Sequence, residues 1–282
     1  MPLFARQNEL KTHLKAFLDQ KKTIGFVPTM GALHQGHLSL MEESLKNNTV
    51  TVVSIFVNPT QFNNPEDLKK YPRTLESDLK KINGLNQNII VYAPSVEDIY
   101  EGNTASKLFE YDGLEFQMEG KHRPGHFDGV GTIVKKLFEI VTPTNAYFGE
   151  KDFQQLQIVR KLVSKYKIPV NIIGCAIYRE SNGLAMSSRN ERLSTEERKN
   201  ASIIYKVLKE AKQLFAIKSA QEVTLWVTKQ LDNQKMFELE YFEIADEKTL
   251  LECKRKTSSK QYRAFIAVFV NNIRLIDNIS LK

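Results

Sequence analysis

The sequence predicts an α/β protein of two domains, with a parallel sheet covered by helices on both faces over residues 1–177 and a smaller α+β domain over residues 178–282. Its 282 residues exceed the usual size of a single domain. Short apolar, β-branched runs alternate with helical patterns through the first part, as they do in βαβ units. After residue 177 the pattern changes to helices followed by alternating apolar and polar runs.

The first 60 residues predict one complete parallel unit. Apolar residues recur at helical spacing between residues 8 and 21: Leu10, Leu14, Phe17 and Leu18. A strand is expected at about residues 23–28 and a helix at about residues 37–46. Residues 49–57 form a nearly continuous β-branched run, which is typical of a strand buried on both faces. Strand, helix and strand in this order predict a right-handed parallel βαβ unit, the repeating element of a Rossmann-like fold.

Further elements continue this pattern to residue 178. Thr74 is expected to cap a helix, and residues 88–93 to form a buried strand. Residues 95–127 contain four glycines between short apolar groups and predict loops over the carboxyl edge of the sheet. A helix over residues 128–141, a short strand and a helix through residue 165, and a strand over residues 170–178 follow.

The C-terminal part predicts two helical stretches and a small antiparallel sheet. The helices are expected at residues 195–218 and 220–234, and the strands at residues 239–244 and 262–271. A dense basic cluster, which includes Lys254, Lys260 and Arg263, is expected to lie in the turn between these strands.

Composition is that of an ordinary soluble globular protein, with 41% hydrophobic and 26% charged residues. The sequence shows no signal peptide and no stretch long enough to span a membrane, so a cytoplasmic location is expected. Cys175 and Cys253 form no C-x-x-C motif and are expected to be reduced and structural. The net charge of +7 lies mainly in the C-terminal part and suits either anionic substrates or RNA.

A glycine-rich turn at residues 25–37 is the first candidate site. It joins the first predicted strand of the βαβ unit to its helix, and it carries His34 and His37. Unpaired amides and the helix dipole favour an anion at such a helix N-terminus, so the turn predicts a triphosphate site. Two alternatives remain at this point: a structural turn with incidental histidines, or a zinc site that would need further ligands.

Three other polar segments also follow predicted strands. Asn58 and Gln61 carry amides that could hold a carboxylate or hydroxyl, Lys151 could contact a phosphate, and Arg189 could pair with phosphate beside two serines. Each has a plainer interpretation: turn chemistry, a surface charge cluster and a linker, respectively. Ligands of open parallel sheets bind where the strands end, which favours a shared site.

Five motifs, taken together and in order, resemble one family. They are P-T-M-G-A-L-H-x-G-H at 28–37, N-P-T-Q-F at 58–62, Y-P-R-T at 71–74, G-E-K-D-F-Q-Q-L at 149–156 and G-L-A-M-S-S-R-N at 183–190. The match spans residues 25–193 and resembles the pantoate–β-alanine ligase (pantothenate synthetase) family. The H-x-G-H element alone would indicate only the wider nucleotidyltransferase superfamily.

The resemblance implies ATP-dependent ligation of pantoate and β-alanine through a pantoyl adenylate, with release of AMP and pyrophosphate. It implies His37, His34, Lys151 and Arg189 as catalytic residues. The ATP site implied by the resemblance comprises Met30, Gly31, Ala32, Leu33, His34, Gln35, Gly36, His37, Gly149, Glu150, Lys151, Asp152, Tyr178, Met186, Ser187, Ser188 and Arg189. Tyr178 stands where an aliphatic residue is expected, with a backbone contact to the nucleotide.

The resemblance also assigns the other substrates. Gln61 and Gln155 match the pantoate positions, and Gln61 also faces β-alanine. Mg²⁺ is the expected cofactor beside ATP; Asp78 matches the metal-side acid, although the preceding residue, often acidic in relatives, is Ser77 here. A homodimer is expected, with the Ser187 to Arg189 loop and the second domain covering the reactive adenylate.

Two rival functions stay open on the sequence. A nucleotidyltransferase acting on a phosphorylated acceptor would share His34, His37 and the serine loop, but it has no use for paired glutamines. An RNA-binding module would suit the positive charge, but the chain has one tryptophan and no aromatic platform motif. The sequence therefore favours small-molecule substrates over nucleic acid or membrane.

Overall fold

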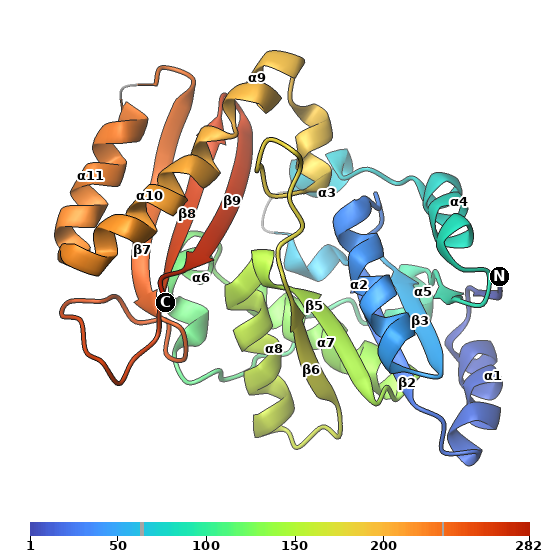
Figure 1. Ribbon diagram of the computed structural model, residues 1–282. Coiled ribbons are helices and arrows are strands. Elements are labelled where there is room, and N and C mark those ends of the chain that lie inside the picture. Colours follow the sequence, from blue (N-terminus) through green and yellow to red (C-terminus); the bar gives the residue numbers. More distant parts are fainter. Residues whose placement is uncertain (63–64, 233) are drawn as a thin grey trace. The chain divides into compact units, whose positions relative to one another are not determined.

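The computed structural model describes residues 1–62, 65–232 and 234–282, and these divide into two compact units (Figure 1). The first unit comprises Met1–Glu115, Gly120–Glu150 and Gln155–Ala176. The second comprises Ile177–Lys282 and also takes two short segments, Phe116–Glu119 and Lys151–Gln154, from the part of the chain expected to form the first domain.

The first unit contains a parallel sheet, which confirms the prediction from the sequence. Its six strands lie in the order β1-β4-β3-β2-β5-β6, and every neighbouring pair is parallel. The strands are β1 (Leu3–Phe4), β2 (Ile24–Thr29), β3 (Val50–Ile55), β4 (Ile90–Tyr92), β5 (Asn145–Gly149) and β6 (Asn171–Cys175). The sequence did not predict β1, because two residues are too few to show a period.

Helices pack on both faces of this sheet, as predicted. Successive strand residues point to opposite faces, and neighbours in β2 show both. Val27 lies in one apolar cluster with Leu40 and Met41 of α2, whereas the Phe26 ring lies 6.3 Å from that of Phe138 in α7. The longer helices are α1 (Gln7–Asp19), α2 (Gln35–Asn47), α4 (Leu75–Leu85), α7 (His126–Val141) and α8 (Phe153–Lys165).

Residues 95–127 are more structured than the predicted loops. They include α5 (Val96–Tyr100), η2 (Leu114–Phe116) and α6 (Met118–His122), and α3 (Pro65–Lys70) is another short helix that was not expected. Tyr111 is fully buried and donates its hydroxyl to the carbonyl of Phe127 at 3.0 Å. Tertiary burial of single aromatic residues, which has no sequence period, orders this region.

Strands β2, β3, β5 and β6 end at the same level of the sheet. Thr29 of β2 pairs with Ile55 of β3, and Gly149 of β5 pairs with Cys175 of β6. The strand order reverses between β2 and β5, where Phe26 pairs with Ala146. Open parallel sheets bind ligands at such a switch point, outside the carboxyl ends of the strands. The segments after β2, β3 and β5 therefore start from one edge.

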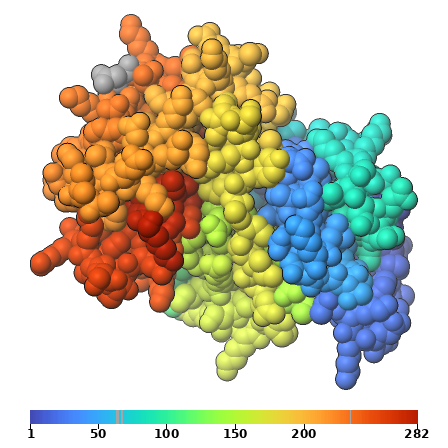
Figure 2. All heavy atoms as spheres, viewed as in Figure 1, coloured from blue at the N-terminus to red at the C-terminus, as the bar shows by residue number. Residues whose placement is uncertain are grey.

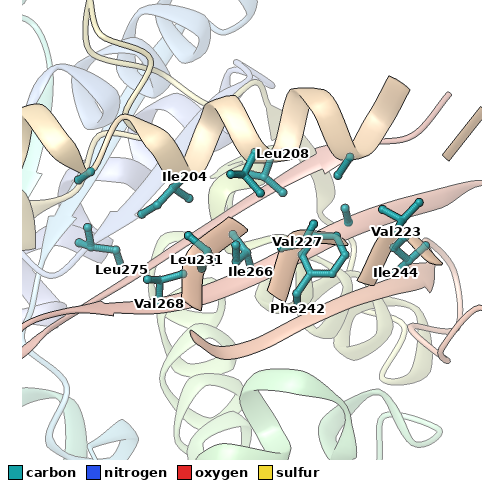
Figure 3. Close-up of a cluster of buried hydrophobic side chains, with 14 of the residues drawn as sticks. Ile204, Leu208, Val223, Val227, Leu231, Phe242, Ile244, Ile266, Val268 and Leu275 are labelled. Carbon is teal, nitrogen blue, oxygen red and sulfur yellow. The ribbon is translucent and has the colours of Figure 1, made fainter. Parts of the chain in front are cut away.

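The second unit packs helices on a three-stranded antiparallel sheet. Its elements are η4 (Ser188–Arg192), α9 (Thr195–Asn200), α10 (Ile203–Ile217), α11 (Ala220–Asp232), β7 (Phe237–Asp246), β8 (Tyr262–Val270) and β9 (Ile273–Ser280). Leu208 of α10 and Val227 of α11 lie against Phe242 and Ile266 of the sheet (Figure 3). In the space-filling view the orange residues of α10 and α11 lie on the visible face of this unit, beside red residues of the C-terminal part (Figure 2).

Three details of this unit differ from the prediction. The expected helix over residues 195–218 is interrupted between α9 and α10, and β9 was not expected at all. Buried Asp277 and Asn278 interrupt the apolar alternation by which β9 could have been recognised. Arg263 lies in β8 rather than in the exposed turn, is 6% exposed and pairs with Glu247 at 3.1 Å. No helix in the described ranges is both long and apolar enough to cross a membrane.

Candidate active site

The loop after β2 makes a sharp turn into α2. Gly31 has a φ of +84° and Ala32 a φ of +50°, both in the left-handed region that suits glycine better than alanine. Helix α2 then begins at Gln35, with His34 at the N-cap. The first backbone N–H groups of a helix lack intrahelical acceptors, so this end of α2 suits an anionic ligand.

His34 and His37 lie together at this helix end. Their ring centroids are 4.0 Å apart, and the backbone N–H of His34 donates to Nδ1 of His37 at 3.3 Å. A neutral imidazole whose Nδ1 accepts a hydrogen bond carries its own hydrogen on Nε2. The fold therefore prepares His37 as a donor through Nε2, which suits contact with a phosphate oxygen.

Asp78 of α4 fixes the conformation of the loop after β2. Its side chain is fully buried, and its two oxygens accept hydrogen bonds from the backbone N–H groups of Ala32 (2.9 Å) and Leu33 (2.7 Å). Thr74 occupies the predicted N-cap of α4, but its hydroxyl donates to Asp78 at 3.2 Å. Lys81 donates to the carbonyl of Leu33 at 2.6 Å. Helix α4 thus fixes both the donors and an acceptor of the loop.

These contacts do not fit Asp78 as a direct magnesium ligand. A metal ligand must present a free lone pair to the ion, whereas this carboxylate is inaccessible and engaged at both oxygens. Within the described ranges no group of three or more His, Cys, Asp or Glu residues could hold a metal ion. The zinc interpretation of the two histidines therefore finds no support in this part of the chain.

Gln61 joins the motif after β3 to the loop after β2. It ends the short turn η1 (Pro59–Gln61), and its Nε2 lies 3.1 Å from Sδ of Met30. Asn58 donates from Nδ2 to Oε1 of the same glutamine at 3.0 Å. A thioether is a weak acceptor, so the Nε2 group can exchange this contact for a carboxylate or hydroxyl at little cost.

Asn58 is a positioning residue whose importance the sequence did not establish. It is 1% exposed, and its Oδ1 accepts from the hydroxyls of Tyr100 (2.6 Å) and Thr60 (3.1 Å). Its Nδ2 also donates to the carbonyl of Gly129 at 3.2 Å. With both ends of the amide engaged, Asn58 cannot rotate freely, and the direction of its bond to Gln61 is fixed.

The backbone of Gln61 is fixed from α7. Nδ1 of His126, a residue only 6% exposed, lies 2.9 Å from the carbonyl oxygen of Gln61, and Arg123 donates to the same oxygen at 3.5 Å. A Cβ atom on Gly129 would lie 2.3 Å from the carbonyl oxygen of Thr60, so only glycine allows α7 to approach η1 this closely. Arg123 and His126 therefore support the site through the backbone of Gln61.

Gln155 and Gly149 belong to the neighbouring strand and helix. Gly149 ends β5, Glu150 begins the turn η3 (Glu150–Asp152), and half-buried Gln155 lies in the first turn of α8. Since β5 pairs with β2, the topology starts this segment from the same edge as the histidine loop. Separate contacts join Gln61 to Met30, His34 to His37, and Asp78 to the backbone of Ala32 and Leu33. Topology alone starts the Gln155 segment from the same edge.

The remaining predicted residues belong to the second unit. Lys151 has a side chain 19% exposed, with Nζ 4.0 Å from Oδ2 of exposed Asp152. Tyr178 is 40% exposed. Its carbonyl accepts from the backbone N–H of Met186 at 3.0 Å, closing a turn through Gly183 with a φ of +94°. Asn182 supports this turn by accepting from the backbone N–H of Leu184 at 3.0 Å.

Hydrogen bonds and an ion pair hold the loop at Ser187 to Arg189 and the residue that follows it. Ser187 accepts from the backbone N–H of Arg189 at 3.2 Å and caps η4, which leaves its hydroxyl hydrogen available as a donor. Asn190 is 1% exposed and donates to Glu180 at 2.7 Å, and Glu180 forms a two-bond ion pair with Arg198, both bonds 2.9 Å. A buried asparagine and a paired glutamate at these positions carry no sequence signal of this role.

The fold and the site define the class of this protein. A parallel sheet with its ligand edge at the switch point, and an H-x-G-H loop that opens a helix there, indicate an α/β enzyme that binds a nucleoside triphosphate. The chain matches the family model described as pantoate-beta-alanine ligase over residues 2–280. The chain belongs to the pantoate–β-alanine ligase family.

Individual relatives agree with this membership. The chain is 76% identical to pantothenate synthetase of Flavobacterium psychrophilum over 282 residues, covering 100% of both chains, and 53% identical to that of Christiangramia forsetii with the same coverage. Among solved structures, pantothenate synthetase from Thermus thermophilus superposes with a TM-score of 0.91 at 37% identity, covering 100% and 99% of the chains.

A further solved structure carries ligands. Pantoate-beta-alanine ligase from Francisella tularensis, complexed with beta-gamma ATP and beta-alanine, is 34% identical, with a TM-score of 0.82 over 100% of this chain and 98% of that one.

Proposed function

We propose that this chain ligates pantoate and β-alanine to pantothenate at the expense of ATP, through a pantoyl-adenylate intermediate. The contact between Gln61 and Met30 carries the proposal, because it puts a neutral amide donor directly beside the H-x-G-H loop. A neutral amide orients the carboxylate of an acid without the ion pair that would make it a poor nucleophile. This contact supports a site for an acid next to a site for a triphosphate.

In the first step a pantoate carboxylate oxygen attacks the α-phosphorus of ATP and the bond to pyrophosphate breaks. Negative charge grows on the α-phosphate and on the leaving group, so preset donors lower the barrier. His34 and His37 at the start of α2 supply such donors, with the family's proton-donor role assigned to His37. The family resemblance assigns Lys151, Arg189 and the two serines to the same phosphates, as cationic and hydroxyl donors.

In the second step the amine of β-alanine attacks the activated carbonyl carbon, AMP leaves with the bonding electron pair, and the nitrogen loses a proton. Gln61 is assigned to both acids and Gln155 to pantoate, so the adenylate and the amine would meet at one edge. The adenylate would hydrolyse in water, which gives the loop at Ser187 to Arg189 and the second unit a covering role.

Magnesium is proposed to arrive with the nucleotide, held by phosphate oxygens and water rather than by Asp78. When bound, it would neutralise charge on the phosphates. The buried position of Asp78 and its two backbone hydrogen bonds support this assignment. The homodimer and the cytoplasmic location stay predictions; light scattering tests the first, and a monomer would have the chain mass of 32.4 kDa.

The deciding experiment is ATP–pyrophosphate exchange by the purified protein, with and without pantoate. Pantoate-dependent exchange, followed by β-alanine-dependent formation of pantothenate and AMP in equal amounts, is the expected result. Exchange without pantoate, or release of a stable nucleotidylated product, would instead show a nucleotidyltransferase. Salt-dependent retention of RNA at sub-micromolar protein would support the RNA-binding alternative.

A further inference from the structure

The segment Lys151–Gln154 is separated from β5, which ends at Gly149, by a single residue, yet it belongs to the second unit. Glu150, between them, belongs to the first unit. Contacts of this segment with β8 and β9 explain why it belongs to the second unit. The carbonyl oxygen of Lys151 accepts a hydrogen bond from Nδ2 of Asn278 in β9 at 2.9 Å. Two residues further on, the Phe153 ring lies 5.9 Å from that of Phe265 in β8, and the Arg263 guanidinium lies 3.9 Å over the Phe153 ring.

Asn278 has one orientation in which it can make this bond. It is 2% exposed, and its Oδ1 accepts from Nη1 of Arg263 at 2.6 Å. Arg263 is itself fixed by its ion pair with Glu247 at 3.1 Å. With the oxygen of the amide directed at Arg263, the NH₂ group is directed at Lys151, so β8 and β9 together determine the place of the residue 151 backbone.

A buried charge pair lies beside this contact in β9. Asp277 is 4% exposed and makes two hydrogen bonds to Arg179, at 2.7 and 3.0 Å. Arg179 also stacks over the Tyr205 ring at 3.6 Å. Burial raises the pKa of Asp277, and the positive charges of Arg179 and Lys151 oppose that rise. The residue next to Asn278 in β9 is thus itself held by a buried ion pair.

The other end of the segment is held as well. Gln154 is 4% exposed; its Oε1 accepts from the backbone N–H of Glu119 at 2.9 Å, and its Nε2 donates to the carbonyl of Gln117 at 2.8 Å. Glu119 in turn receives two hydrogen bonds from Arg274 of β9, at 2.9 and 2.6 Å, and one from Tyr241 of β7 at 2.8 Å. The segment is fixed at both ends to the antiparallel sheet.

We infer that Asn278, held by Arg263, is a positioning residue for Lys151, so that the C-terminal unit and not β5 determines where the Lys151 ammonium stands during adenylate formation. The inference rests on the proposed function, which gives Lys151 its role on the phosphates. It gives the C-terminal unit a part in the first chemical step beyond covering the adenylate. Misplacement of a catalytic group by about 1 Å can cost on the order of 100-fold in rate.

The test is Asn278→Asp, which has nearly the same shape. The aspartate keeps an oxygen for Arg263, but replaces the NH₂ donor with an oxygen that repels the Lys151 carbonyl. We expect kcat of pantoate-dependent ATP–pyrophosphate exchange to fall roughly 10- to 100-fold, with KM for pantoate within about three-fold of wild type. Asn200→Asp, at an exposed asparagine that ends α9, is the matched control and should leave exchange unchanged.

A double-mutant cycle separates positioning from a general structural effect. In a Lys151→Ala background Asn278→Asp should cause no further loss, because the side chain that it positions is gone. Full additivity of the two losses, or wild-type exchange by Asn278→Asp alone, would overturn the inference. Trp226, the single tryptophan, packs against the core of this unit, so its fluorescence reports whether each variant is folded.

A failure to fold, a failure of the proposed function and a failure of the inference give three different results. If Asn278→Asp fails to fold, Asn278→Ser removes the amide donor without adding charge and is held to the same criteria. If the wild-type protein shows no pantoate-dependent exchange, the proposed function fails. If the wild type is active and the cycle is additive, only the positioning of Lys151 by Asn278 fails.

Discussion

The carboxylate of Asp78 accepts a hydrogen bond from the backbone N–H of Leu33 at 2.7 Å, across 45 residues of sequence. Its second oxygen accepts a hydrogen bond from the backbone N–H of Ala32. The Asp78 side chain thus supplies acceptors for two backbone N–H groups that the left-handed turn would otherwise bury without one. A buried donor without an acceptor costs about 1–3 kcal/mol. The shape of the H-x-G-H loop therefore depends on a residue outside the motif.

Asp78→Asn keeps the shape of the side chain but presents an NH₂ group to one of these amides. We expect a loss of about 1–3 kcal/mol in stability and a rise in KM for ATP, with an unchanged magnesium midpoint of exchange. Glu76→Gln, an exposed carboxylate in the same helix, is the control. A large shift of the magnesium midpoint in Asp78→Asn alone would show a metal ligand instead.

Two substitutions of His37 separate the contribution of its Nδ1 atom from that of its Nε2 atom. Asparagine places an amide near Nδ1 and preserves an acceptor for the His34 N–H, whereas glutamine places an amide near Nε2 and preserves a donor toward the phosphates. We expect His37→Asn to lose roughly 100- to 1,000-fold in adenylate formation and His37→Gln distinctly less. Equal losses would mean that the Nε2 hydrogen bond is not the important one, and activity near wild type in both would exclude the role.

Gln155 tests the assignment of the pantoate pocket. Gln155→Ala removes an amide at the start of α8 without touching the histidine loop, so KM for pantoate should rise about 10-fold or more while KM for ATP changes little. The measurement is exchange kinetics with each substrate varied in turn. An equal rise for both substrates would place Gln155 at a general structural position.

Asp246 tests the acid stability of the C-terminal unit. Burial raises the pKa of this carboxyl, but hydrogen bonds from Thr249 and Lys248 outweigh the effect and leave the pKa below its ordinary value of 3.8. A lowered native pKa stabilises the fold above pH 3.8, and this contribution is lost progressively as pH falls from that value through the lower native pKa. Asp246→Asn should therefore destabilise the unit by about 1–3 kcal/mol at pH 7 and by less at pH 3.

Urea unfolding, followed by the fluorescence of Trp226, measures the loss of stability at each pH, and Trp226 packs against the core of the same C-terminal unit as Asp246. The control is Asp232→Asn, an exposed carboxylate at the end of α11. Equal destabilisation of Asp246→Asn at both pH values would mean that the charge of Asp246 is not what its hydrogen bonds stabilise.

The sequence determined what local patterns record. The β-branched run of β3 and the helical spacing in α7 identified the parallel sheet and its helices, and His34 and His37 lie at the helix end where the glycine-rich turn placed them. The five motifs were sufficient to indicate the family, which the family comparison confirms. These features depend on residues close together in the chain.

Only the tertiary structure decided which side chains hold the site in place. Asp78, Asn58 and Asn278 act through hydrogen bonds to residues 45, 71 and 127 positions away, and no period or motif in the sequence encodes such a partner. The same holds for Lys151, which follows a strand of one unit yet is fixed to the other. A buried polar group finds its partner only when the chain has folded, since its hydrogen bond is set by distance in space.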